Sequence, residues 1–102
     1  MNVVARSRLE AFWRRPQYRG SEQALKVWYA EVTRARWTCP QDIKNQYRSA
    51  SFVGHNRVVF NIKGNDYRLI VAVAYEYGAV YVKFVGTHQQ YDAVDAATVE
   101  ME

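Results

Sequence analysis

Three strand-like runs with two short turns between them occupy most of the second half of this chain of 102 residues. The runs are Arg57–Ile62, Tyr67–Tyr75 and Ala79–Thr87, and their sequence has the period of two that is typical of β-strands. The segments between them, Lys63–Asp66 and Glu76–Gly78, each contain a glycine. Because strands joined so closely pair antiparallel, this region predicts a meander and restricts the fold more than any other part of the sequence.

The first half of the chain has helical periodicity instead. Ser7 and Glu10 have the spacing of a capping box, which predicts a helix from Ser7 through Arg15 that ends at Pro16. A second helix is predicted to begin near Ser21, since apolar residues then recur at steps of three and four. The apolar stripe of this helix, which we assign to core packing, contains Ala24, Leu25, Trp28, Tyr29 and Val32.

The order of these elements predicts an α+β fold. Asn2–Ala5 fits a short edge strand, and Gln41–Ser49 fits either a short helix or an ordered loop. Since helices precede strands, the expected architecture is a small antiparallel β-sheet with N-terminal helices packed on one side. A chain of this length is expected to form one domain, residues 1–102.

The composition excludes several classes of protein. With 49% apolar residues the chain can bury a core, unlike a disordered chain. No apolar run approaches the roughly 20 residues of a membrane span, and Met1–Glu10 carries three charged residues where a signal peptide is apolar. We therefore expect a cytoplasmic protein without a membrane anchor. Cys39 is the single cysteine and no metal-ligand spacing is present, so neither a metal nor another cofactor is predicted.

Charge is distributed unevenly along the chain. Residues 1–57 contain eleven Lys and Arg against four Asp and Glu, whereas residues 58–102 contain three against six. The first part therefore has a charge of +7, which favours a polyanionic partner. A solvated, Arg-rich helical surface explains the same charge equally well.

Counting along the predicted hairpins brings polar residues of three strands together. If both turns are even-numbered, Asn61 faces Arg68 and Arg68 faces Thr87, whereas an odd second turn places His88 opposite Arg68. Arg68 is also the one basic residue of its apolar run, where a charge is costly unless it is paired or faces water. In either register, one end of the sheet gathers Lys63, Arg68, His88 and Tyr91.

This set of side chains suits the cleavage of RNA, in which a ribose 2′-hydroxyl loses a proton, the phosphate gains charge and the leaving oxygen gains a proton. Arg68 and Lys63 are predicted to hold the phosphate, and His88 to transfer a proton near neutral pH. Tyr91 positions the nucleophile, exchanges a proton or stacks on a base, and which residue acts as acid or base stays open. The alternative is structural: His88 caps a turn and Tyr91 anchors a short helix.

Four motifs occur in a recognisable order: Val58–Ile62, Asn65–Ile70, Tyr81–His88 and Tyr91–Asp92. This order resembles the HigB-type toxins of bacterial type II toxin-antitoxin modules, within the RelE-like superfamily. The resemblance covers residues 2–95 and is most specific between the first and last motifs.

The resemblance implies a fold, an activity and a partner. The fold would be RelE-like, and the activity that of a ribosome-dependent mRNA endoribonuclease, or mRNA interferase, which inhibits translation by metal-free cleavage. The partner would be a helix-turn-helix antitoxin of the HigA type, in a toxin-antitoxin hetero-oligomer. The family's catalytic residues carry over to Lys63, Arg68, His88 and Tyr91.

Three further residues are assigned to substrate binding. The resemblance adds Asn61, the even-numbered register adds Thr87, and Arg57 is the basic residue that opens the first of the three strands. A hypothesis of another class is a noncatalytic RNA- or ribosome-binding module, in which the basic half docks on phosphates and aromatic residues stack. The two differ in outcome, because only the enzyme creates new RNA ends.

Overall fold

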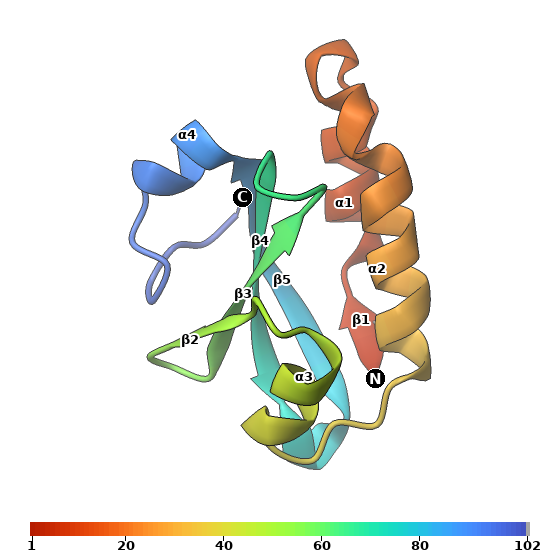
Figure 1. Cartoon of the computed structure of the whole chain (residues 1–102), viewed down its shortest axis with the longest axis vertical. Helices are drawn as coiled ribbons and strands as arrows, with labels where there is room; N and C mark the ends of the chain where they lie inside the picture. Colours follow the sequence, from red (N-terminus) through yellow and green to blue (C-terminus); the bar gives the residue numbers. More distant parts are fainter. Residues whose placement is uncertain (102) are drawn as a thin grey trace.

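The computed structural model describes residues 1–101, which form one five-stranded sheet with helices around it (Figure 1). In chain order the elements are β1 (Asn2–Val4), α1 (Arg6–Trp13), a 3₁₀ helix (Pro16–Ser21), α2 (Glu22–Arg34), α3 (Pro40–Gln46), β2 (Ser51–Val53), β3 (Arg57–Ile62), β4 (Tyr67–Ala74), a 3₁₀ turn (Tyr75–Tyr77), β5 (Ala79–Thr87) and α4 (His88–Asp92). The spatial order of the strands is β1-β5-β4-β3-β2. The predicted α+β class is confirmed.

The predicted meander is present, and two short strands extend it. β3, β4 and β5 pair antiparallel, and their bounds agree with the predicted runs to within one residue. β1 lies at the expected edge but pairs parallel with β5, and β2 is an unpredicted partner of β3. The sheet is therefore mixed where a wholly antiparallel sheet was expected. A parallel pair needs a long connection, and most of the chain lies between β1 and β5.

The first helix begins differently from the prediction. Its N-cap is Ala5, in an extended conformation and without a capping side chain, and the helix starts at Arg6. The Ser7–Glu10 capping box is therefore wrong. Glu10 instead forms ion pairs one turn away, at 3.8 Å from Arg6 and 3.7 Å from Arg14. Exposed pairs of this kind contribute little, so packing rather than capping stabilises α1.

The pattern of burial confirms part of the predicted apolar stripe of α2 and shows how α3 packs. Within the predicted stripe of α2, Leu25, Trp28 and Val32 are buried. The segment left open between helix and loop is helical, as α3, with Ile43 buried beneath it. Asp42 accepts hydrogen bonds from the Thr38 amide and hydroxyl at 2.8 and 2.7 Å, and the backbone bond is the main reason why the pKa of Asp42 is lowered.

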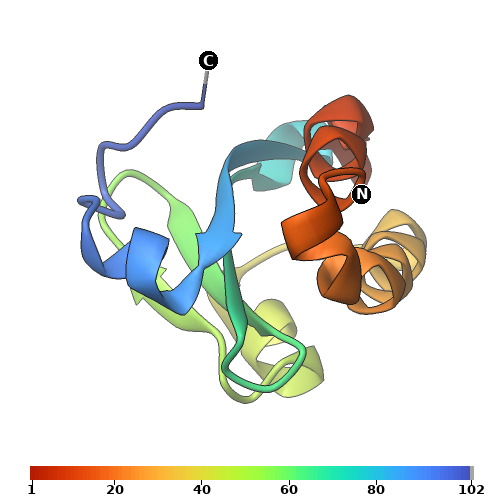
Figure 2. The same cartoon turned by 90° about the horizontal axis from the view of Figure 1, so that it is seen from above.

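The core lies between the sheet and these three helices, on one face of the sheet. Phe60 is at its centre: its ring lies 5.5 Å from that of Trp28, 6.2 Å from that of Trp37 and 5.1 Å from that of Tyr47. Figure 2 shows α1 and α2 on one side of the sheet, and α4 with the C-terminal segment (residues 94–101) on the other. The prediction that the N-terminal helices share one side is confirmed.

The register of β3 with β4 was predicted, but that of β4 with β5 was not. Asn61 does face Arg68. Arg68 faces Gly86, however, and neither Thr87 nor His88 as the two counted registers expected. Two features of this hairpin account for the difference. The loop between β4 and β5 contains four residues, and the pairing of β4 with β5 shifts by one residue between Ile70 and Val71. A bulge of this kind inserts one unpaired residue, which pattern counting cannot locate.

Because three aromatic rings surround Phe60, we expect Phe60→Ala to lower the free energy of unfolding by about 3–5 kcal/mol, measured by urea denaturation. Tyr77→Ala is the control, since Tyr77 is 78% exposed at the far turn and its removal should change stability by less than about 0.5 kcal/mol. Equal losses in the two variants would contradict this placement of the core.

Candidate functional site

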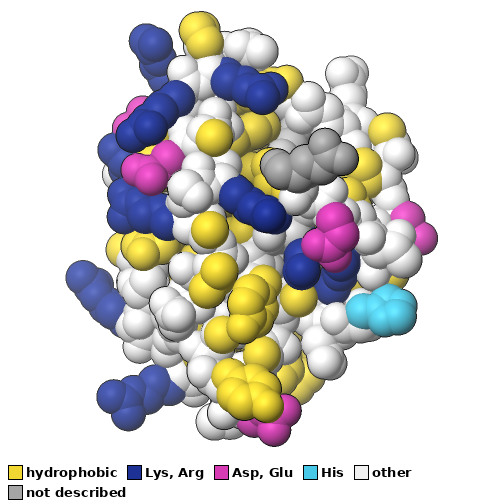
Figure 3. All heavy atoms as spheres, turned by 180° about the vertical axis from the view of Figure 1, so that it is seen from behind, with side chains coloured by type: hydrophobic (Ala, Val, Ile, Leu, Met, Phe, Trp, Pro, Cys, Tyr) yellow, Lys and Arg dark blue, Asp and Glu magenta, His cyan; other side chains and the backbone are white. Residues whose placement is uncertain are grey.

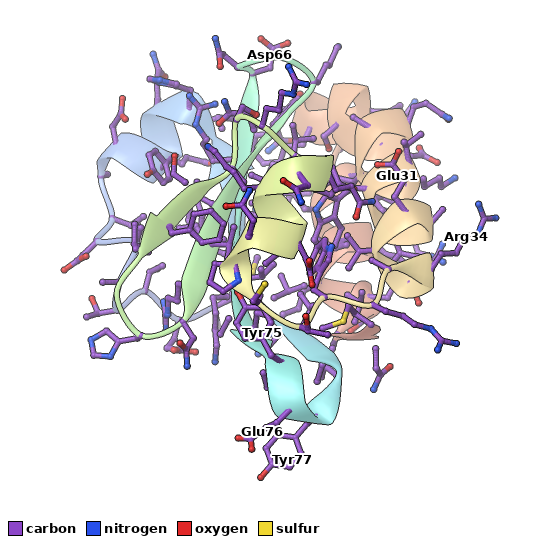
Figure 4. The ribbon with its side chains drawn as sticks, turned by 60° about the horizontal axis from the view of Figure 1, so that its bottom comes forward. Glu31, Arg34, Asp66, Tyr75, Glu76 and Tyr77 are labelled. Carbon is purple, nitrogen blue, oxygen red and sulfur yellow. The ribbon has the colours of Figure 1, made fainter. Side chains whose placement is uncertain are left out.

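The candidate residues lie at the end of the sheet that carries the β3–β4 loop. Figure 4 labels Asp66 in this loop, at the opposite end of the molecule from Glu76 and Tyr77. The amide of His88 donates to the Asp66 carbonyl at 3.1 Å, which fixes the start of α4 beside the loop. Residues more than 20 positions apart thus share one end, as the sequence predicted.

Arg68 is held on the face of the sheet that lies opposite the core. Its Nη1 donates to the carbonyls of Asn65 at 2.9 Å and Tyr67 at 3.3 Å, which fixes the direction of the side chain. The guanidinium carbon lies 5.7 Å from the centre of the Tyr91 ring, within the range of a cation-π contact. Within residues 1–101 no carboxylate pairs with Arg68, so its positive charge is available to a ligand.

Two small or polar neighbours complete the surroundings of Arg68. Gly86 faces it from β5, and a Cβ at this position would come within 2.6 Å of Phe84 and 2.8 Å of Gln90. Asn61 faces it from β3 and donates to the Asn65 side chain at 3.4 Å. Asn65, which the sequence analysis did not select, therefore links the two polar residues. Its position in a four-residue turn was the available signal.

Thr87 has a structural role that explains how α4 is positioned. Its Oγ1 accepts from the Gln90 amide at 3.2 Å, while the Gln90 side chain accepts from the Thr87 amide at 2.9 Å. This is a capping box, and it satisfies two backbone amides at once. Gln90 also donates to the Tyr18 hydroxyl at 2.7 Å, so it ties α4 to the helical half. Gln90 was missed, although its Thr-x-x-Gln spacing is present in the sequence.

His88 and Asp92 form a pair on the exposed side of α4. Nδ1 of His88 lies 3.2 Å from Oδ2 of Asp92, and the two side chains are 50% and 59% exposed. A carboxylate at Nδ1 orients the imidazole and leaves Nε2 directed away from it. Tyr91, one turn after His88 and half-buried, carries the aromatic ring that Arg68 meets. The structure therefore brings Arg68 and Tyr91 together, with the His88–Asp92 pair on the same short helix.

Two predicted site residues do not join this cluster. Lys63 is exposed in the turn, and its ammonium lies 3.2 Å from the position that a Cβ on Gly20 would occupy, beside the Tyr67 hydroxyl and thus on the helical side. Arg57 is buried, and the C-terminal segment engages its guanidinium. Proximity at one end of the sheet was predictable, but the face on which each long side chain lies was not.

A separate hollow lies on the α1 side of α4. A groove of about 730 Å³ runs between α1, β5 and α4. Phe12, Tyr18, Phe84 and Val94 are among its lining residues, and the charged ones within the described chain are Arg8 and Arg15. A surface without a histidine or carboxylate offers little for proton transfer near neutral pH, so the Arg68 cluster remains the candidate for chemistry.

The fold and this cluster define a small α+β protein compatible with the RelE-like class. A family model described as the HigB toxin, the RelE-like toxic component of a toxin-antitoxin system, matches residues 21–94. Since the match spans most of the chain, the chain belongs to the HigB toxin family, and an antitoxin partner follows from that membership. No curated protein matches the sequence. Among residues 1–101, no helix has both the length and the apolar character needed to span a membrane.

Thr87→Ala should release α4 while leaving the sheet folded, because it removes one half of the capping box at a cost of about 1 kcal/mol. The expected result is faster hydrogen exchange at the Gln90 amide, measured by NMR, with unchanged exchange at core amides of β4. Thr87→Ser keeps the hydroxyl and serves as the control. Unchanged Gln90 exchange in the Ala variant would show that the cap does not hold this helix.

Proposed function

We propose that this protein is the toxin of a type II toxin-antitoxin module and acts as a ribosome-dependent mRNA endoribonuclease. One observation carries the proposal: in a member of a toxin family, the Arg68 guanidinium, which pairs with no carboxylate among residues 1–101, lies against Tyr91 on the helix that holds the His88–Asp92 pair. These groups match the three demands of phosphodiester cleavage, which are charge on the phosphate, proton removal and proton delivery.

In the proposed reaction, the ribose 2′-oxygen attacks the adjacent phosphorus and the bond to the 5′-oxygen breaks. The products are a 2′,3′-cyclic phosphate and a 5′-hydroxyl, and one proton moves from the 2′-hydroxyl to the protein while another moves to the leaving oxygen. Arg68 binds a non-bridging phosphate oxygen, where its planar fork neutralises the developing charge. His88 transfers a proton through Nε2, since Asp92 occupies the Nδ1 side.

Three other residues have supporting roles in the proposal. Tyr91 positions the attacking ribose or stacks on its base, because its ring already lies against the arginine that binds the phosphate. Asn61 extends the polar row across β3, next to Asn65. Lys63, at the rim on the helical side, contacts a neighbouring phosphate of a strand that passes over the turn.

The proposed partners are mRNA on the ribosome and a HigA-type helix-turn-helix antitoxin, and the place of action is the cytoplasm. The support for a ribosomal partner is the basic helical half, where exposed arginines include Arg14, Arg19, Arg34 and Arg36. In the view from behind, Lys and Arg side chains are most frequent along the helical edge (Figure 3). Such a surface suits the phosphates of ribosomal RNA.

If the proposal holds, Arg68→Ala and His88→Ala should each reduce mRNA cleavage on translating ribosomes by at least about 100-fold and abolish growth arrest. Cleavage is measured by mapping new mRNA 5′ ends. His55→Ala is the matched control, because His55 lies exposed in the turn between β2 and β3, away from α4. Full cleavage by both site variants would exclude this assignment.

The same assay separates the enzyme from the noncatalytic alternative, which the exposed arginines of the helical half favour. A binding module associates with ribosomes in a salt-sensitive manner and leaves no new 5′ ends, and Arg34→Ala would weaken it more than His88→Ala. The nuclease proposal expects the reverse order of effects on cleavage. New ends at rates above those of a ribosome-only control decide for the enzyme, and their absence decides for the module.

A further inference from the structure

A second cationic centre lies on the same face of the sheet as Arg68, beneath the C-terminal segment. After α4 the segment of residues 94–101 continues without a further helix or strand, and Ala96, Val99 and Glu100 contact Arg57 on this face (Figure 2). At its end Met101 packs against the core beside α1. Ile70 and Val59 of this face are buried although they are not part of the core on the helical side. The segment therefore shields part of this face of the sheet from solvent.

Arg57 and Lys83 share one carboxylate within this segment. Nη2 of Arg57 lies 2.5 Å from one oxygen of Glu100, and Nζ of Lys83 lies 3.0 Å from the other. Nη1 of Arg57 also donates to the carbonyls of Ala96, at 3.2 Å, and Val99.

The two cations belong to the sheet, whereas the anion does not. Arg57 opens β3, faces Ala72 of β4 and has a side chain that is 7% exposed. Lys83 is the extra residue of the bulge in β5, between Val82, paired with Val71, and Phe84, paired with Ile70. A bulge redirects a side chain, and here it sends a lysine onto the face that carries Arg57. Strand pairing therefore fixes the position of Arg57, and the pairs on either side of the bulge fix the position of Lys83.

Glu100 is attached far more loosely than the cations it joins. Its side chain is 58% exposed, and it lies on a segment outside regular secondary structure. Hydrogen bonding to Lys83 is the largest cause of its lowered pKa, followed by the bond from Arg57. A buried arginine needs an anionic or polar partner, but nothing requires that this partner belong to the same chain.

We propose that Arg57 and Lys83 form a second phosphate-binding site for single-stranded RNA, and that Glu100 occupies it as an internal substitute which RNA displaces. A carboxylate shared through two oxygens has the geometry that two non-bridging phosphate oxygens would adopt. Arg57 and Asn61 lie on the same face of β3, about 13 Å apart along the strand. One RNA strand can thus contact the Arg68 cluster and this site together. The identity of the ligand rests on the proposed function.

The test compares Glu100→Gln with Glu76→Gln, which changes the net charge equally but lies exposed in the turn between β4 and β5 and forms no ion pair within residues 1–101. The probe is a short 2′-O-methyl oligonucleotide, which keeps every phosphate and cannot be cleaved through a 2′-hydroxyl. We expect Glu100→Gln to bind it roughly three- to tenfold more tightly than the unchanged protein, and Glu76→Gln to differ by less than about twofold. The slope of log affinity against log salt should steepen by about 0.7 for each added phosphate contact.

A second variant distinguishes the site from a general loosening of the segment. Lys83→Gln combined with Glu100→Gln should lose the gain, since one of the two cations is removed. Equal affinities of the two single variants, or a gain that survives the loss of Lys83, would overturn the proposal. If Glu100→Gln binds the oligonucleotide more tightly but the protein does not cleave mRNA on ribosomes, the second phosphate site is supported and only the nuclease proposal is contradicted. The two proposals can therefore fail separately.

Discussion

The pairing of β4 between β3 and β5 determines which side chains enter the core and which face the opposite side. Because side chains alternate along a strand, Leu69 and Val71 enter the core while Arg68 and Ile70 face the opposite side. The burial of the apolar set fixes the register, and the register in turn fixes where Arg68 lies. A slip by one residue would place its charge in the core, which is prohibitively costly.

The same constraint explains why the molecule divides its tasks between two faces. One face is committed to Phe60 and the aromatic rings of the helical layer. The other carries Arg68 near α4 at one end and Arg57 beneath the C-terminal segment. Both arginines of the second face have a partner from the C-terminal part of the chain. α4 supplies the Tyr91 ring to Arg68, and the segment after α4 supplies the Glu100 carboxylate to Arg57. The proposed RNA path is the strip between them.

Periodicity and turn chemistry were sufficient to predict the three long strands, the buried stripe of α2 and the pairing of Asn61 with Arg68. They were insufficient where geometry depends on a single residue. The spacing of a capping box occurs at Ser7–Glu10 and at Thr87–Gln90, and only tertiary contacts decide that the second one forms. Likewise, the bulge at Lys83 carries no local signal, and a lysine as long as Lys63 can lie on either face. The end of the sheet that gathers the site was predictable, but its contacts were not.

The proposed RNA interface is the face of the sheet that carries Arg68 and α4. An NMR titration of the ¹⁵N-labelled protein with a 2′-O-methyl oligonucleotide tests it directly. If RNA binds there, chemical-shift changes concentrate at Arg68, His88 and Tyr91 and continue toward Arg57 on β3. Changes confined to the exposed face of α2, around Arg34, with none at Arg68 or Tyr91, would contradict it.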